Sequence, residues 1–224
     1  SRGLGDVYKR QAQILYYLAE NLSARTVEFT NNLQLLTGRA DAKIEVEASI
    51  QRLFFYAAWA DKFDGSARSV PLKAIALVMN EAIGNCGVIC DDRYPLLGFI
   101  SAMAPLFATG NRSIIIPSEP FSPIVTDFYQ VLDTSDVPPG TVNILTGKHT
   151  DLAIELASHM DIESVWSFST SDVSRDIEKA SVSNLKRTWV SNGEKRDWYN
   201  EESQGKQFLT KSTENKTIWI PYGE

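Results

Sequence analysis

The sequence predicts an α/β fold in which a parallel sheet is covered by helices on both faces. Two observations carry this prediction. Short apolar segments typical of buried strands alternate with segments in which apolar residues recur every three or four positions, the spacing of an amphipathic helix. Such alternation is typical of a parallel sheet with helical connections. The 224 residues are 43% hydrophobic and 22% charged, which is the composition of a globular protein with one substantial core.

The amino-terminal part is expected to be a helical arm over residues 13–65. We interpret residues 1–12 as a non-native leader that is not part of the fold, because SRGLGDVYKRQ differs in character from the rest. Gly38 is placed to end the second helix of the arm. The first and third helices are predicted by apolar stripes that comprise Ile14, Leu15, Leu18 and Leu22, and then Val46, Ile50, Leu53 and Ala57.

The main domain is expected over residues 66–195. It begins with two β-rich segments, residues 74–80 and 85–90, and Gly84 between them predicts a hairpin. Strands then alternate with helical segments near Leu96, Val125, Leu152 and Ile177. The strands are predicted at residues 113–116, 142–145, 164–168 and 187–191.

Residues 196–224 are expected to form a tail and a terminal strand. The tail is polar over residues 197–205, and the apolar strand covers residues 217–220. An isolated strand would present an unpaired edge, so we expect it to join a sheet of this chain or of a partner.

Composition excludes several classes of function. The net charge of −6, without basic runs, argues against a nucleic-acid partner. No apolar stretch approaches the roughly 20 residues that span a bilayer, so we expect no membrane association and a cytoplasmic location. With two cysteines and two histidines in the chain, no cluster of soft metal ligands can be assembled.

The two cysteines, Cys86 and Cys90, are expected to be free thiols beside the core. On one strand they would lie about 13 Å apart, at about 3.3 Å per residue, whereas a disulfide needs α-carbons within about 7 Å. Cys90 closes a predicted strand, where it is a candidate nucleophile. Asp91 and Asp92 follow it, and their negative charges would raise the pKa of the thiol, which opposes activation.

Several motifs resemble those of the aldehyde dehydrogenase family. They are GNCGVICDDRYPLLGFISAMAPLFATGNRSIIIPSE, VPPGTVNILTG, NLKRTWVSNGEK and GKQFLTKSTENKTIWIPYGE. The resemblance implies a Rossmann-like domain of the cofactor-binding type, an oligomerisation hairpin and a carboxyl-terminal strand. It also implies that the catalytic domain is missing between Lys195 and the terminal segment.

The resemblance implies NAD or NADP as cofactor, with binding weakened or lost. The family's Lys-Pro-Ser-Glu motif matches residues 116–119, where Ile116 replaces the ammonium donor and Glu119 could hold the ribose or suit a helix start. The Phe-Thr-Gly-Ser turn matches residues 167–170, whose hydroxyls could donate to phosphate or cap a helix. The candidate cofactor residues are Pro117, Ser118, Glu119, Gly147, Ser169 and Thr170.

No catalytic residue is expected. Arg93 stands where the family has the asparagine that stabilises the oxyanion, and beside Asp91 it is expected to form an ion pair. Ser191 stands where the family has its glutamate base, and Glu194, three residues on, is no evident substitute. The nucleophilic cysteine of the family follows that motif, and this chain has no cysteine after Cys90.

The sequence therefore predicts a pseudoenzyme. It resembles the degenerate carboxyl-terminal module of long two-module aldehyde dehydrogenases, with a structural or oligomerisation role. Its expected partner is an upstream active module or an identical subunit, joined by strand pairing. Two alternatives stay open: a part of an active NAD(P)-dependent enzyme that oxidises aldehydes to acids, and a sensor that binds NAD(H) without turnover.

Overall fold

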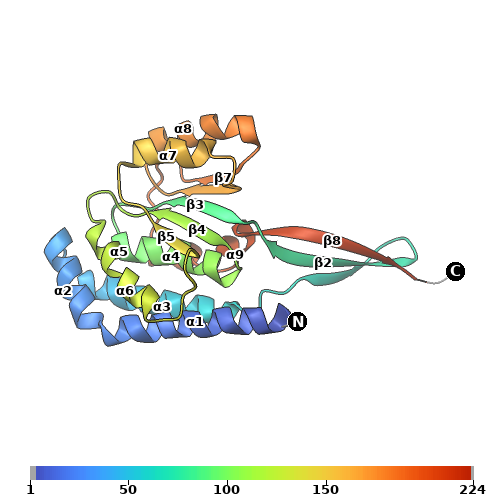
Figure 1. The fold of residues 1–224 in the computed structure, drawn as a ribbon, viewed down its shortest axis with the longest axis horizontal. Coiled ribbons are helices and arrows are strands. Elements are labelled where there is room, and N and C mark those ends of the chain that lie inside the picture. The colour runs from blue at the N-terminus through green and yellow to red at the C-terminus, as the bar shows by residue number, and fades with distance from the viewer. Residues whose placement is uncertain (1–3, 223–224) are drawn as a thin grey trace.

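The computed structural model describes residues 4–222, which form nine α-helices, two 3-10 turns and two β-sheets (Figure 1). The helices are α1 (Leu4–Ala24), α2 (Thr26–Thr37), α3 (Ala42–Trp59), α4 (Pro95–Ala108), α5 (Pro123–Asp127), α6 (Tyr129–Asp133), α7 (His149–Ser158), α8 (Ser171–Ser181) and α9 (Lys206–Lys211). The strands are β1 (Ser66–Ser69), β2 (Ala74–Ala82), β3 (Asn85–Ile89), β4 (Arg112–Ile116), β5 (Val142–Ile144), β6 (Ser164–Ser167), β7 (Arg187–Val190) and β8 (Thr213–Pro221).

The central sheet is parallel and has the order β5-β4-β3-β6-β7. Strand β3 lies in its middle, with Val88 opposite Ile115 of β4 and Trp166 of β6. The chain winds from β3 through β4 to β5 on one side and then crosses to β6 on the other. In open sheets of this kind the reversal of strand order leaves a crevice at the carboxyl ends of the strands.

Helices cover both faces of this sheet, as the sequence predicts (Figure 1). Cys86 and Val88 of β3 point into a cluster shared with α1, α3 and α4, whereas Ile89 points into a second cluster shared with α7 and α8. Successive side chains of a strand face opposite sides, so one strand supplies both cores. The α/β prediction with a doubly covered parallel sheet is confirmed.

The helical arm forms as predicted over α1, α2 and α3. Leu15, Leu18 and Leu22 of α1 are fully buried. Gly38 follows α2 with φ of +68°, the left-handed conformation that glycine adopts without strain. Helix α1 already begins at Leu4, so the boundary predicted at residue 12 does not coincide with the end of an element. The non-native origin of residues 1–12 stays a prediction.

The second sheet has the order β1-β2-β8 and is antiparallel. We call these three strands the β-arm, because β2 and β8 extend away from the helices and the parallel sheet (Figure 1). Strand β8 pairs with β2 along its whole length, from Thr213 to Pro221. The predicted terminal strand is thus present and longer than expected, and it joins a sheet of this chain.

The predicted hairpin of residues 74–80 with residues 85–90 is wrong. Strand β2 forms its hairpin with β1, while β3 is the central strand of the parallel sheet. The reason is burial: Val88 and Ile89 are both fully buried on opposite faces of β3, which requires helices on both sides. Gly84, with φ of +131°, turns the chain from one sheet to the other.

The tail predicted as polar packs against the core of the parallel-sheet body. Trp198, Phe208 and Leu209 are fully buried. The Trp198 indole donates to the carboxylate of Asp91, with Nε1 and Oδ2 3.2 Å apart. The buried guanidinium of Arg52 donates to the carbonyls of Trp198 and Ser203. Three buried apolar side chains therefore anchor a segment whose other residues are mostly polar.

Within residues 4–222, no helix combines the length and the apolar character that crossing a bilayer requires. Over the same residues, no three His, Cys, Asp or Glu side chains come together as metal ligands.

Candidate functional site

The candidate cofactor residues gather at the carboxyl ends of β4, β5 and β6. Pro117 and Ser118 follow β4 and are buried, and Glu119 beside them is exposed. Ser169 and Thr170 follow β6 and precede α8. Gly147 lies between β5 and α7, where a Cβ would come within 2.8 Å of Leu152 Cδ1, so the loop packs tightly on α7. These positions border the crevice that the strand order predicts.

His149, the first residue of α7, joins the two motifs across this crevice. Its ring is 4% exposed. Nε2 lies 2.7 Å from the carbonyl oxygen of Pro117, and Nδ1 lies 3.2 Å from Oγ of Ser169. The backbone N–H of His149 donates to Oε2 of Glu119 at 2.9 Å. One histidine therefore contacts three of the six residues that the sequence proposes for a cofactor.

Glu119 serves as a cap in this arrangement. Its carboxylate accepts the N–H at the start of α7, where the helix dipole favours a negative charge. Its own N–H donates to Oδ1 of Asp92 at 2.8 Å. Of the two readings of Glu119, helix capping is the one for which the structure shows contacts, although α7 is another helix than the one that follows Glu119 in sequence.

The hydroxyls of residues 169 and 170 are likewise engaged. Thr170 is the N-cap of α8 and its Oγ1 accepts the N–H of Val173 at 3.4 Å. Ser169 contacts His149 as described above. A dinucleotide with its ribose at Glu119 and its phosphates at Ser169 would have to displace these contacts, because the groups that the motifs match are occupied within the chain.

Sequence reasoning missed His149 as a member of this site. The available signal was a histidine two residues after Gly147, at the end of a predicted strand where the ligand crevice lies. The sequence could not show that its ring turns inward, because that depends on the separation of Pro117 and Ser169 in space.

The position matched to the oxyanion donor is occupied by an internal ion pair. Arg93 Nη2 lies 2.8 Å from Oδ2 of Asp91 and donates to the carbonyl of Arg196, also at 2.8 Å. The N–H of Arg93 donates to the same carboxylate. The Asp91 carboxylate thus holds both Arg93 and the buried Trp198 indole, and the ion-pair interpretation of Arg93 has its contacts in the structure.

Neither thiol is placed as a nucleophile. Cys86 and Cys90 are free and fully buried. Burial raises the pKa of the Cys86 thiol to about 12. Burial also raises the pKa of Cys90 far above its ordinary value, and the charges of Asp91 and Asp92 add to that effect. A thiol must ionise to attack a carbonyl, and these environments oppose ionisation.

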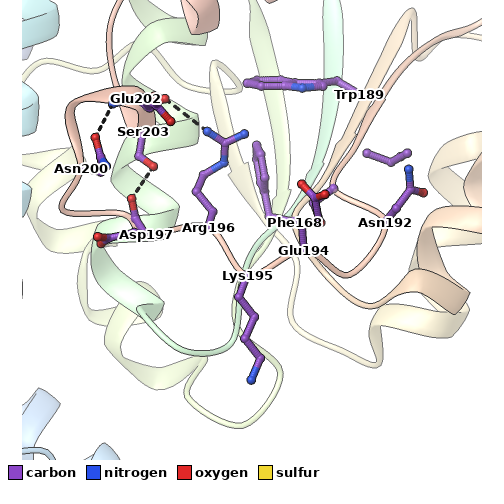
Figure 2. A pocket seen from close by; sticks show the side chains of 12 residues that line it. Phe168, Trp189, Asn192, Glu194, Lys195, Arg196, Asp197, Asn200, Glu202 and Ser203 are labelled. Carbon is purple, nitrogen blue, oxygen red and sulfur yellow. Dashed lines mark hydrogen bonds between the residues drawn. The ribbon is translucent and has the colours of Figure 1, made fainter.

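A pocket of about 400 Å³ lies beside the carboxyl end of β7 (Figure 2). Arg196 is its central cation, and its guanidinium carbon lies 5.5–5.7 Å from the centroids of four aromatic rings. Desolvation lowers the pKa of Arg196. Figure 2 shows Lys195 pointing away from that guanidinium. The four rings belong to Phe168, Trp189, Trp198 and Phe208.

Ser191, matched to the family's base, lies at the rim of this pocket. Its hydroxyl donates to the carbonyl of Ser169 at 3.3 Å. Glu194 also lines the pocket and is exposed, and its N–H donates to the carbonyl of Ser191 at 2.9 Å, closing a turn. The pocket therefore holds a carboxylate in Glu194, but neither thiol of the chain lines it.

Comparison with known proteins assigns the chain to a family. A model described as the aldehyde dehydrogenase family matches residues 6–199. The chain belongs to the aldehyde dehydrogenase family. The resemblance of the motifs is thereby confirmed, and curated relatives and solved structures agree with it.

Two curated relatives illustrate the extent of the match. Omega-crystallin of Enteroctopus dofleini is 31% identical over 182 residues, which cover 80% of this chain and 36% of the relative. Retinal dehydrogenase 2 of Gallus gallus is 29% identical over 201 residues, 86% of this chain and 39% of the relative. The chain thus spans under two fifths of the length of these relatives.

Solved structures share the fold. The crystal structure of PnpE from Pseudomonas sp. WBC-3 superposes with a TM-score of 0.78 at 26% identity, covering 82% of this chain and 38% of PnpE. PnpE in complex with nicotinamide adenine dinucleotide gives a TM-score of 0.79 at the same identity, over 84% of this chain and 39% of PnpE. The α/β architecture is therefore that of the aldehyde dehydrogenases, and one of these structural neighbours, PnpE, was solved with nicotinamide adenine dinucleotide bound.

Proposed function

We propose that this chain is a non-catalytic aldehyde dehydrogenase module with a structural role in assembly. The observation that carries the proposal is the β-arm, a projecting sheet with a half-exposed apolar face and a free edge. The matched catalytic positions support it, because Arg93 and Ser191 make internal contacts and both thiols are buried. A non-catalytic role explains why Arg93, Ser191 and the two thiols contact other parts of the chain and are not free to react with a substrate.

The apolar surface of the β-arm lies on β2, β8 and the residue after β8. Ile75 of β2 is opposite Ile220 of β8, and their side chains are 44% and 47% exposed. Trp219 is 53% exposed and Tyr222 is 54% exposed. Large apolar groups that gather on one element of a soluble protein commonly mark a contact surface.

The outer edge of β8 adds backbone groups to this surface. In the part of the chain that the structure describes, β8 pairs with β2 alone. A nine-residue edge strand offers unpaired N–H and C=O groups to another strand. We propose that an identical chain occupies this edge by strand pairing, and that an upstream aldehyde dehydrogenase module is the partner within a longer protein.

Replacing Trp219 by glutamate is expected to dissociate this assembly. A carboxylate in place of the Trp219 indole, which is 53% exposed on the face of β8 opposite to Ile220, would lose its hydration upon association, which costs several kcal/mol unless it is paired. Light scattering coupled to size exclusion should show a dimer or larger species for the unmodified chain and a monomer for the variant. The matched control is Leu35→Glu on α2, because Leu35 is 85% exposed and lies outside the β-arm. An unmodified chain that is monomeric at all concentrations would contradict the proposal.

The competing function is that of one part of an active enzyme that oxidises aldehydes to acids with NAD(P). Family membership and the names of the retinal dehydrogenases favour it. In that case the thiolate and the base would come from residues beyond this chain, and the present residues would supply contacts.

A further inference from the structure

The ring of His149 lies where a dinucleotide would cross the sheet edge. Pro117 follows β4 and Ser169 follows β6, with β3 between these two strands. The imidazole reaches both, at 2.7 Å and 3.2 Å, and therefore bridges the carboxyl end of the central strand. This is the point where strand order reverses and where open α/β sheets bind their ligands.

We propose that His149 closes the dinucleotide crevice from within, so that the intact chain does not take up NAD(P) at the residues its family motifs match. The proposal does not rest on the assembly role of the β-arm. It assigns a task to a buried histidine that neither the fold nor the ion pairs of the chain otherwise use.

The hydrogen-bonding roles of the ring follow from its partners. The Pro117 carbonyl can only accept, so Nε2 carries a proton and donates to it. Nδ1 then exchanges a hydrogen bond with the Ser169 hydroxyl, which can donate or accept. Both ring nitrogens are satisfied, and the ring is 4% exposed. The imidazole would lose both hydrogen bonds if it left this buried position.

The backbone of His149 strengthens the closure. Its N–H occupies Oε2 of Glu119, the one carboxylate that the family motif provides for the ribose. A dinucleotide that entered the crevice would also have to displace the ring from its two hydrogen-bond partners, the Pro117 carbonyl and the Ser169 hydroxyl. The loss of two hydrogen bonds of about 1 kcal/mol each corresponds to a roughly 30-fold loss of affinity.

The test compares NAD⁺ binding to the intact chain and to His149→Ala by calorimetric titration. Alanine keeps the backbone N–H and the helix start but removes the ring. The matched control is His159→Ala, because His159 is the other histidine of the chain and lies exposed just after the opposite end of α7. We expect no saturable heat up to millimolar NAD⁺ for the intact chain and for His159→Ala. For His149→Ala we expect saturable submillimolar binding.

Two results would overturn the proposal: saturable micromolar binding by the intact chain, or a folded His149→Ala that binds no better than the intact chain. The first result would also establish the sensor alternative, while leaving the β-arm proposal standing. A loss of dimers in light scattering bears on the β-arm alone, so the two proposals can fail separately.

A second measurement tests whether His149 closes the crevice even if His149→Ala does not fold. In ¹⁵N-histidine NMR spectra of the intact chain, two imidazoles are present, and His159→Ala assigns them. We expect the His149 ring to show an Nε2–H that exchanges slowly with water and does not respond to millimolar NAD⁺. A rapidly exchanging ring, or a His149 resonance that shifts on addition of NAD⁺, would show that the crevice is open.

Discussion

Replacing Glu45 by alanine is expected to lower the free energy of unfolding by about 3–5 kcal/mol, the range for removing one partner of a buried ion pair. The Glu45 side chain is fully buried. Its Oε1 accepts the N–H groups of Leu96 and Leu97 at 2.9 and 3.1 Å, which caps α4 from α3. Its Oε2 accepts from Arg39 at 2.6 Å.

The physical reason for this large effect is the number of groups that alanine would leave unpaired. Two orphan donors at the start of α4 lose their acceptor together, and the Arg39 guanidinium keeps only its ion pair with Asp41 and its hydrogen bond to the Arg93 carbonyl. Burial raises the pKa of Glu45, whereas Arg39 and the two N–H groups lower it. Helix α4 is buried over its whole length, so the cap cannot be replaced readily by water.

Urea denaturation followed by circular dichroism measures this effect. Glu47→Ala is the matched control, because Glu47 lies on the same helix, is exposed and pairs with Lys43 at 3.6 Å. Exposed pairs of this spacing contribute about 0.3–0.5 kcal/mol. If Glu45→Ala and Glu47→Ala lower the free energy of unfolding equally, the buried carboxylate of Glu45 contributes no more to stability than an exposed one.

Replacing Arg52 by methionine is expected to cost about 3–5 kcal/mol, because each buried acceptor left without a partner costs about 1–3 kcal/mol. The Arg52 guanidinium is 4% exposed and donates to the hydroxyl of Ser101 and to the carbonyls of Trp198 and Ser203. Burial lowers its pKa to about 10. Methionine fills a similar volume without the donors.

The loss of stability in Arg52→Met should be accompanied by local unfolding of the segment around Trp198 and Ser203. Amide hydrogen exchange detects such unfolding. Arg187→Met is the control, because Arg187 is 51% exposed and forms a surface pair with Glu214 at 2.8 Å. We expect that control to change stability by less than about 1 kcal/mol. Unaltered amide exchange around Trp198 in Arg52→Met would show that Arg52 does not hold this segment in place.

The sequence predicted the parallel sheet well, because each strand there is a short apolar run with a helix on either side. Strands β4 to β7 fall within two residues of their predicted limits. The predicted partner of β2 was wrong. Local turn chemistry at Gly84 suits a hairpin as well as a crossing between sheets, and only the burial of Val88 and Ile89 on both faces distinguishes them.

Residues that depend on distant partners were harder to predict. Nothing near Trp198 in the sequence shows that the buried guanidinium of Arg52, 146 positions earlier, donates a hydrogen bond to its carbonyl. The role of Glu119 as a cap requires the start of α7 to lie against the end of β4. Motif matching located the edge of the sheet where these groups meet, and the fold determined which of them contact one another.

We propose that the chain carries no group poised for the chemistry of its family, and thiol labelling tests this proposal most directly. The intact protein would be treated with iodoacetamide between neutral and mildly alkaline pH. Mass spectrometry would then measure how far each of its two cysteines is alkylated. Because burial raises the pKa of both Cys86 and Cys90, we expect neither to react until the protein unfolds. Rapid alkylation of native Cys90 at neutral pH would reveal an available thiolate and contradict the proposed non-catalytic role.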